Sequence, residues 1–290
     1  MEIVFPNPGQ IMRRRMLAHK SFLAGGAMVA LVFLIAIFAP VIAPHNPYAQ
    51  DLNNRIIPPF WNELGTWDHP LGTDHMGRDY LSRLLYGARI SLLIGFSTMM
   101  ISAAIGIIIG LLGGYFGGKV DMVVTYIITT RLSLPVILVA VAIVALIGGS
   151  MQIVIIVLGC LIWDHFAVVI RSNTQQIRAL DYVPAAQAAG CSVLWILSRE
   201  IMPNLLNNIV IVSTLTISRA IILEASLSFL GMGVQPPIPS WGLMISEGKE
   251  FIFFNPFLVI IPGVTLFLLV LGMNLFGDGL RDVTSTEDRL

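Results

Sequence analysis

Ionisable side chains lie within apolar runs of the sequence, where a buried charge is costly unless it faces a partner or a water-filled path. Asp164 and His165 are adjacent in the fourth run, so on a helix they point about 100° apart. Arg219 and Glu224 lie in the fifth run, and Arg219 would stand roughly 16 Å above the inner end of its helix. Charges at such depths are typical of a path for ions or polar solutes.

The two charges of the fifth run each have a structural explanation as well. Arg219 either faces the path or pairs with a partner subunit, and Glu224 either reaches water at the outer end or contacts a neighbouring helix. Neither a nucleophile nor a metal motif accompanies Asp164 and His165. We therefore expect no catalysis by this chain.

A second group of residues suggests metal chemistry that its spacing does not support. His69, Asp74 and His75 could offer ligands, but two histidines six residues apart across Pro70 and Gly72 match no regular ligand pattern. We therefore expect no metal site.

A third pattern imitates a phosphate-binding loop. Gly113, Gly118 and Lys119 have the required spacing, but Val120 stands where Ser or Thr would ligate magnesium, and the glycines follow an apolar helix rather than a strand. We expect no nucleotide or other cofactor on this chain. Helix packing explains the glycines better, because small residues that recur every four positions let another helix approach closely. These residues are Ser102, Gly106, Gly110, Gly114 and Gly118.

Membrane-spanning helices are the elements that must position these residues. Of the 290 residues, 56% are hydrophobic and only 12% are charged, and the mean hydropathy is +0.83. A water-soluble surface cannot be built from so few charges, and backbone amides in lipid are paired within helices. The fold class is therefore an all-α polytopic membrane protein. Its six predicted transmembrane helices are 21–43, 90–112, 122–147, 153–170, 209–230 and 257–276.

Charge and cysteine content exclude other classes of protein. The 17 basic and 17 acidic residues cancel, which argues against a nucleic-acid partner, and two cysteines cannot form a disulfide scaffold. With the N-terminus inside, the cytoplasmic connections hold ten Lys and Arg residues and the external ones hold four. This asymmetry predicts that both termini are cytoplasmic.

The predicted organisation follows from these spans. A cytoplasmic N-terminus (1–20) precedes the first helix (21–43), a periplasmic linker (44–86), a five-helix core (87–277) and a cytoplasmic tail (278–290). Two connections within the core are too long to be turns, a cytoplasmic one (171–208) and an external one (231–255).

The end of the periplasmic linker has the pattern of a short amphipathic helix. Leu81, Leu84 and Leu85 share one helical face, with Arg83 opposite. We expect a separate interfacial helix lying on the membrane, with a simple solvent loop as the alternative.

The long cytoplasmic connection carries a recognisable pattern. Pro184 to Ala186, then Gly190, then Ile201 to Pro203 resemble the EAA signature of ABC-importer permeases, although the signature's Glu is Pro184 here and its Ile is Glu200. The sequence reads as two short helices broken at Gly190. An apolar surface between flanking charges marks a protein contact. Its members are Ala185, Ala186, Val193, Leu194 and Leu197.

Further segments are similar to the second permease chain of dipeptide, oligopeptide and nickel importers. Tyr126 and Thr129 depart from that family, as does the tail from Val283 to Leu290. The matching segments are His69 to Asp74, Gly77 to Asp79, Leu81 to Arg83, Glu224 to Gly231, Gln235 to Pro237, Pro239 to Gly242, and Gly277 to Asp282.

The resemblance implies a type I ABC importer permease in the bacterial inner membrane. It would pair with a homologous permease, two cytoplasmic ATPases that bind ATP and Mg, and an external solute-binding protein. We expect di- or oligopeptides as substrate because metal ligands are few, with nickel or another small solute as the alternative. A secondary transporter is a remoter alternative, since paired inverted repeats are not found.

The resemblance also assigns roles to residues. The external connection would form a rigid element over the path through Gln235, Pro236, Pro237 and Trp241, or an interfacial cap with Trp241 at the headgroups. The cytoplasmic loop would dock in a groove of the ATPase subunit. Its docking residues would be Pro184, Ala185, Ala186, Gly190, Val193, Leu194, Glu200 and Pro203.

Overall fold

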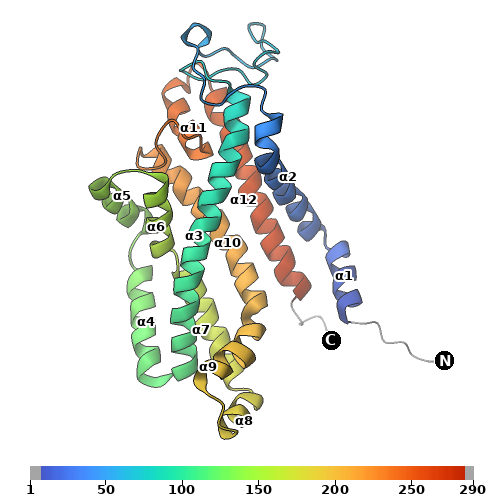
Figure 1. The fold of residues 1–290 in the computed structure, drawn as a ribbon, viewed down its shortest axis with the longest axis vertical. Coiled ribbons are helices and arrows are strands. Elements are labelled where there is room, and N and C mark those ends of the chain that lie inside the picture. Colours follow the sequence, from blue (N-terminus) through green and yellow to red (C-terminus); the bar gives the residue numbers. More distant parts are fainter. Residues whose placement is uncertain (1–7, 285–290) are drawn as a thin grey trace, which may run out of the picture.

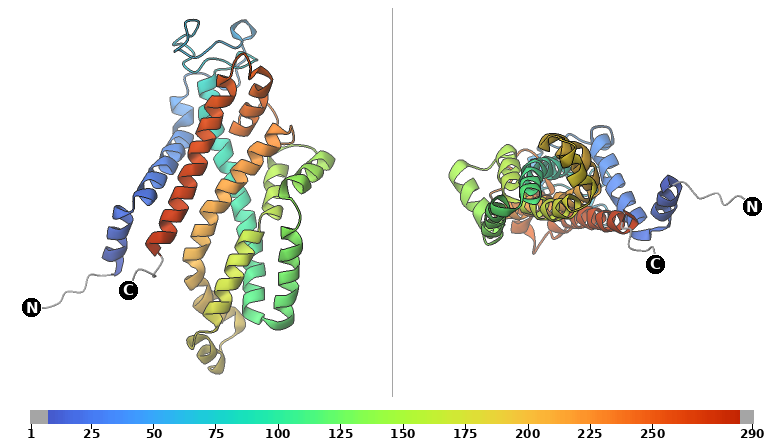
Figure 2. Two further views of the ribbon diagram at one scale, coloured as in Figure 1. Left: turned by 180° about the vertical axis from the view of Figure 1, so that it is seen from behind. Right: turned by 90° about the horizontal axis from the view of Figure 1, so that it is seen from below.

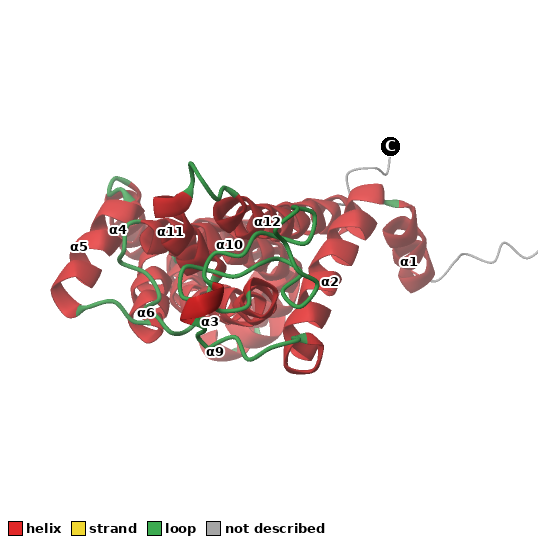
Figure 3. Ribbon diagram, turned by 90° about the horizontal axis from the view of Figure 1, so that it is seen from above, coloured by secondary structure: helices red, strands yellow, loops and turns green. Residues whose placement is uncertain are grey.

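Helices and the loops between them make up the described residues, 8–284, of the computed structural model (Figure 3). Extended backbone pairs there at one isolated bridge, between Thr73 and Asp79. The α-helices are α1 (Pro8–Ala18), α2 (Lys20–Ile42), α3 (Tyr80–Phe116), α4 (Gly118–Leu132), α5 (Val136–Ile147), α6 (Met151–Leu161), α7 (Asp164–Arg178), α8 (Tyr182–Ala188), α9 (Val193–Trp195), α10 (Met202–Phe229), α11 (Trp241–Gly248) and α12 (Phe257–Thr284). Shorter turns are η1 (Leu52–Asn54), η2 (Ile196–Ile201) and η3 (Lys249–Phe251).

The longest helix, α3, is the axis of the molecule, with α2 and α12 on one side and α4 to α6 on the other (Figure 1). The Asp79 carboxylate caps its first turn by accepting a 2.7 Å hydrogen bond from the Ser82 amide. Its 37 residues run without interruption to Gly117, whose φ of 65° ends it. The expectation of a separate interfacial helix before the second span is therefore wrong: residues 80–86 are the first turns of α3, because Asp79 supplies a helix start and nothing breaks the helix after it.

The predicted close approach along the glycine stripe of α3 is confirmed. A Cβ built on Gly106 would lie 2.5 Å from the Phe166 Cβ, and one on Gly114 would lie 2.5 Å from the Thr174 Cβ. The missing side chains let α3 pack directly against α7. Gly118 does not belong to the stripe, because it begins α4 with nothing within 4 Å of an added Cβ.

A predicted single span at 122–147 is instead two helices, α4 and α5, bent by 79°. The break falls at Pro135, which lacks a backbone N–H and disfavours helical geometry at Leu134. Five helical segments of the described part of the chain are long and apolar enough to cross a membrane, and the bent pair makes a sixth if counted as one span.

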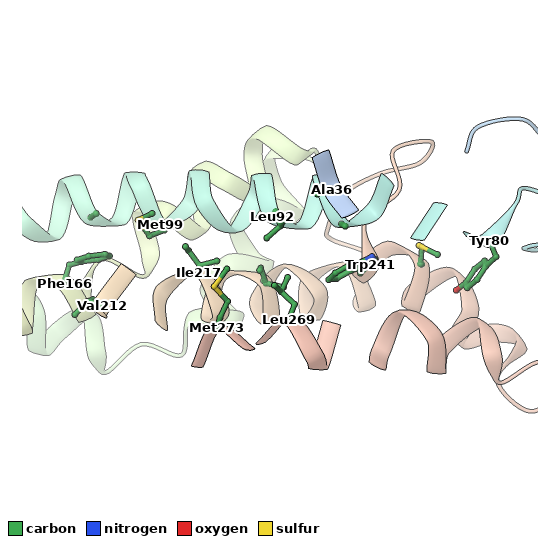
Figure 4. Close-up of a cluster of buried hydrophobic side chains, with 14 of the residues drawn as sticks. Ala36, Tyr80, Leu92, Met99, Phe166, Val212, Ile217, Trp241, Leu269 and Met273 are labelled. Carbon is green, nitrogen blue, oxygen red and sulfur yellow. The ribbon is translucent and has the colours of Figure 1, made fainter. Parts of the chain in front are cut away.

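The main hydrophobic core lies where α3 and α12 meet α2, α10 and α11 (Figure 4). Leu92 and Met99 of α3 face Ile217 of α10 and Met273 of α12, all less than a tenth exposed. This core fixes α10 and α11, which carry several of the candidate site residues.

The two ends of the bundle differ in kind. The loop 43–79, α11 and the short connections beside it cover one end, and α8 and α9 form the other (Figure 2). The start of α1 and the end of α12 point toward the end of the bundle that α8 and α9 form (Figure 2). Residues 1–7 and 285–290, within the predicted cytoplasmic N-terminus and tail, lie outside the described part.

Candidate coupling and translocation site

The hairpin formed by α8 and α9 turns at Gly190, as the sequence predicts. Its φ of 80° is left-handed, and the Gly190 and Cys191 amides donate to the Gln187 and Ala186 carbonyls at 3.0 and 3.1 Å. This is the paired hydrogen bonding of a glycine-terminated helix. Ser192 then caps α9 by accepting from the Trp195 amide.

One face of this hairpin is anchored in the bundle. Val183 of α8, together with Ile196 and Ile201 of the adjoining turn η2, is buried against Tyr115 of α3 and Ile170 of α7. The hairpin is therefore in direct contact with these two long helices.

The opposite face leaves an apolar surface uncovered. Leu194 is 77% exposed and its neighbours Val193 and Trp195 are also exposed, together with Ala185 of α8. Two residues expected on this surface, Ala186 and Leu197, instead pack half-buried against the inner cluster. Adjacent residues of a helix point about 100° apart, so Ala186 turns inward where Ala185 is exposed, and Leu197 likewise turns inward in η2. Sequence reasoning missed Trp195 and Leu180, whose apolar side chains next to the motif were the available signal.

The remaining motif residues define the edges of the hairpin. Pro184 is exposed in the first turn of α8, and Pro203 is exposed at the start of α10, where its missing N–H costs no hydrogen bond. Glu200 is half-buried, and its carbonyl accepts a 2.7 Å hydrogen bond from the Asn204 amide group.

Three helices bring charges together in the middle of the molecule. Asp164, 1% exposed at the start of α7, lies 3.7 Å from Arg219 of α10 and 4.0 Å from Arg131 of α4. Two guanidinium groups share one carboxylate, so the cluster keeps one net positive charge. His165 is exposed on another face of α7, consistent with the predicted divergence.

Arg131 is a residue that sequence reasoning set aside. Its side chain lies in the bend between α4 and α5 and donates to the carbonyls of Leu134, at 3.3 Å, and Leu161. A permanent cation inside the predicted span 122–147, with an acidic residue in the next span, was the signal that could have found it.

Glu224 does not reach water at the outer end, contrary to one expectation. Its side chain is 1% exposed and accepts hydrogen bonds from Ser228 at 2.8 Å and Ser240 at 3.0 Å. The contact to a neighbouring element, the other alternative, is the one observed. It joins α10 to the start of α11.

The connection 231–255, which the sequence predicts to be external, is fixed to the bundle by the buried side chain of Trp241. Trp241 is 2% exposed, and its indole N–H donates to the Leu84 carbonyl at 2.9 Å. The interpretation as a headgroup anchor is therefore wrong, because Gly87 leaves a slot in α3 that the indole fills. Gln235, Pro236 and Pro237 remain exposed on the outer rim.

A buried ion network holds the loop 43–79 on α11. Arg78 donates to Asp74 at 2.6 Å, and both Arg78 and Arg83 donate to Glu247, at 3.1 and 2.8 Å. Both arginine side chains are 1% exposed or less. Arg83 was expected on the polar face of an interfacial helix, but its partner Glu247 of α11 lies too far along the sequence for the local pattern to indicate it.

Comparisons with known proteins agree with this architecture. The family model described as "Binding-protein-dependent transport system inner membrane component" matches residues 106–283, and the N-terminal transmembrane domain of oligopeptide transport permease C matches residues 7–59. The chain is 38% identical to the di/tripeptide transport system permease protein DppC of Pseudomonas aeruginosa, covering 97% of this chain and 92% of that one. It is 41% identical to the dipeptide transport system permease protein DppC of Escherichia coli K12, covering 91% and 88%.

A solved structure supports the fold. The inward-facing MetNI methionine ABC transporter superimposes with a TM-score of 0.58 at 21% identity, covering 70% of this chain and 97% of that one. Since the family model spans more than half of the sequence, the chain belongs to the binding-protein-dependent transport system inner membrane components, as a multi-pass permease with the type I ABC importer fold.

Proposed function

We propose that this chain is one of two permease subunits of an ATP-driven importer of di- and oligopeptides. It pairs with a homologous permease, receives substrate from an external solute-binding protein and is driven by two cytoplasmic ATPases, which bind the ATP and Mg. The observation that carries this proposal is the hairpin α8–α9, apolar on its outer face and packed into the bundle on its inner face.

The hairpin is suited to transmit motion rather than to bind solute. An exposed apolar patch on a helical hairpin is a typical protein contact, and Leu194 and Trp195 would fill a groove of the ATPase subunit. Val183 and Ile196 pass the movement to α3 and α7, so that ATP-driven closure of the ATPases opens the path on the opposite side.

The central charge cluster supports a path for an anionic group. Arg131 and Arg219 exceed Asp164 by one positive charge, and the Arg219 side chain is 33% exposed. A passing peptide carries an N-terminal ammonium and a C-terminal carboxylate, and this charge attracts the carboxylate end. Nickel is a cation, and the same charge repels it. The relatives named for peptide transport favour the same substrate.

In the proposed orientation, the hairpin lies in the cytoplasm and the loop 43–79 lies outside. The excess of basic residues in the connections near the α8 end supports this arrangement, with both termini on the cytoplasmic side.

The test is ATP hydrolysis by the reconstituted complex of both permeases, both ATPases and the binding protein. Dipeptides or oligopeptides presented by the binding protein should stimulate hydrolysis and accumulate in vesicles, whereas nickel presented in the same way should not. Stimulation by nickel and not by any peptide would contradict the proposed substrate and leave the permease role intact.

A further inference from the structure

Two imidazoles and two carboxylates meet where the loop 43–79 joins the start of α3. The rings of His45 and His69 lie 4.7 Å apart, and each has one nitrogen facing Asp79 and the other facing Asp68. Asp79 is 2% exposed, and its Oδ1 lies 2.8 Å from Nδ1 of His69, within hydrogen-bond distance. Nδ1 of His45 is buried without a hydrogen bond, 3.7 Å from the same carboxylate.

The outward nitrogens converge on a single group. Nε2 of His45 lies 3.7 Å from one oxygen of Asp68, and Nε2 of His69 lies 3.8 Å from the other. One nitrogen of each ring and one Asp68 oxygen all lie within 4.8 Å of one another. Ligands of a tetrahedral zinc ion, each about 2.0–2.1 Å from the metal, are separated by about 3.3–3.4 Å. The nitrogen-to-oxygen distances exceed this separation by about 0.4 Å, and any pair of the three ligand atoms must close by at most about 1.5 Å.

The carboxylate of Asp79 is positioned to orient the two histidine rings. A histidine that ligates a metal usually donates its other N–H to a carboxylate, which fixes the ring and raises its basicity. Asp79 lies on the Nδ1 side of both rings and is itself fixed as the cap of α3. His45 is held in addition by its amide, which donates to the Ser82 hydroxyl at 3.1 Å.

We propose that His45, His69 and Asp68 form a binding site for a first-row divalent transition cation of the zinc class, supported by Asp79. The site leaves a coordination position open to water. Imidazole and carboxylate ligands with this geometry favour such an ion over calcium or magnesium, which take oxygen ligands alone. The bound ion ties the exit of α2 and the tip of the loop to the first turn of α3.

The sequence does not indicate this site, because the two histidines that form it are far apart in the chain. His69 and His75 are neighbours in sequence, but in the structure His69 pairs with His45, which lies 24 positions earlier in the chain. A second acidic cluster around His75, with Asp74 and Glu247, is a poorer candidate because both carboxylates already pair with Arg78.

The test measures zinc binding by the assembled complex, purified without a polyhistidine tag and stripped with a chelator. Equilibrium dialysis against Zn²⁺ should find one zinc per copy of this chain that wild type holds and His45→Ala loses. Asp68→Asn should weaken binding at least about tenfold without affecting folding, since the Asp68 side chain is 77% exposed. Asp79→Asn should weaken it about 10- to 100-fold while asparagine preserves the helix cap.

His75→Ala and His19→Ala are the matched controls and should bind zinc as wild type does. Substitution of Co²⁺ should give visible absorption bands that vanish in His45→Ala. Absence of this zinc from the wild-type complex, or its full retention by both His45→Ala and Asp68→Asn, would overturn the proposal and leave the cluster as ion pairs. Loss of zinc in His75→Ala alone would overturn it in favour of the other cluster.

Discussion

Single side chains in this permease divide into charges that hold the structure and charges that remain available. Glu224 accepts hydrogen bonds from Ser228 of its own helix and from Ser240 at the start of α11, and Glu247 pairs with arginines from another part of the chain. The Asp164 carboxylate is shared by Arg131 and Arg219, so it is the counter-charge on which both depend. Removing a charge that holds the structure should lower stability, whereas removing an available charge should lower transport and leave stability unchanged.

The cluster around Asp164 gives the first prediction. Asp164→Ala leaves two cations uncompensated and should lower stability by about 3–5 kcal/mol, measured as thermal unfolding in detergent. Arg219→Ala leaves Asp164 paired with Arg131, so the complex should assemble normally and only peptide uptake should fall. Lys119→Ala, which removes an exposed cation at the end of α4 opposite Arg131, is the control and should leave both assembly and uptake unchanged. Failure of assembly in Arg219→Ala would show that this arginine holds the structure instead.

The ion network at the other end gives the second prediction. Glu247→Ala removes the shared partner of Arg78 and Arg83, which are both buried, and should destabilise the protein by about 3–5 kcal/mol. Protease digestion of the loop 43–79 and the melting temperature should both report the loss. Glu250→Ala, three residues away and exposed, should change neither. Equal melting temperatures for the two variants would contradict the network's role.

At the scale of elements, the sequence predicted the features that depend on residues close together in the chain. The apolar runs gave the spans, the glycine spacing gave the face of α3 that meets α7, and Gly190 gave the break in the hairpin. Two of the errors have a common physical cause. Arg83 and Trp241 occupy positions that suit a membrane surface, but each is buried by a partner far away in the sequence.

The candidate site was also predictable only in part. The exposed part of the hairpin followed from its motif, whereas the grouping of Arg131 with Asp164 depends on how α4 and α7 pack, which one sequence does not specify. The bend at Pro135 was visible in the sequence as a proline within an apolar run.

Packing of α3 against α7 gives the third prediction. An alanine Cβ at Gly110 would lie 2.8 Å from the Ile170 Cβ and 2.9 Å from the Ala167 carbonyl oxygen, which cannot move independently of its helix. Gly110→Ala should therefore destabilise the protein by about 1–3 kcal/mol, read as a lower melting temperature. Gly263→Ala in α12 adds the same methyl group where nothing lies within 4 Å, and should be neutral or slightly stabilising. An unchanged melting temperature in Gly110→Ala would contradict the close packing.

At the scale of the whole molecule, the two ends of the bundle carry different kinds of surface. The loop 43–79, with its ion network and histidine cluster, covers one end, and the hairpin with its uncovered apolar face forms the other (Figure 1). The charge cluster lies between them. An importer requires this arrangement if one end receives substrate and the other receives force.

The orientation of these ends gives the fourth prediction. In a variant without Cys160 and Cys191, a single cysteine at the exposed Asn53 should react with an impermeant thiol reagent in intact cells. A cysteine at the exposed Gln176, near the hairpin, should react only after the membrane is opened. The reverse labelling would invert the proposed topology.

The fifth prediction tests the central claim, that the hairpin α8–α9 couples ATP hydrolysis to transport. Leu194 and Leu64 are 77% and 78% exposed at opposite ends, so aspartate at either position should leave the fold of this chain intact. The decisive measurement is peptide-stimulated ATP hydrolysis together with peptide uptake in the reconstituted complex. Leu194→Asp should lose both while the binding protein still captures peptide, and Leu64→Asp should retain both. Normal stimulated hydrolysis and normal uptake in Leu194→Asp would contradict the account.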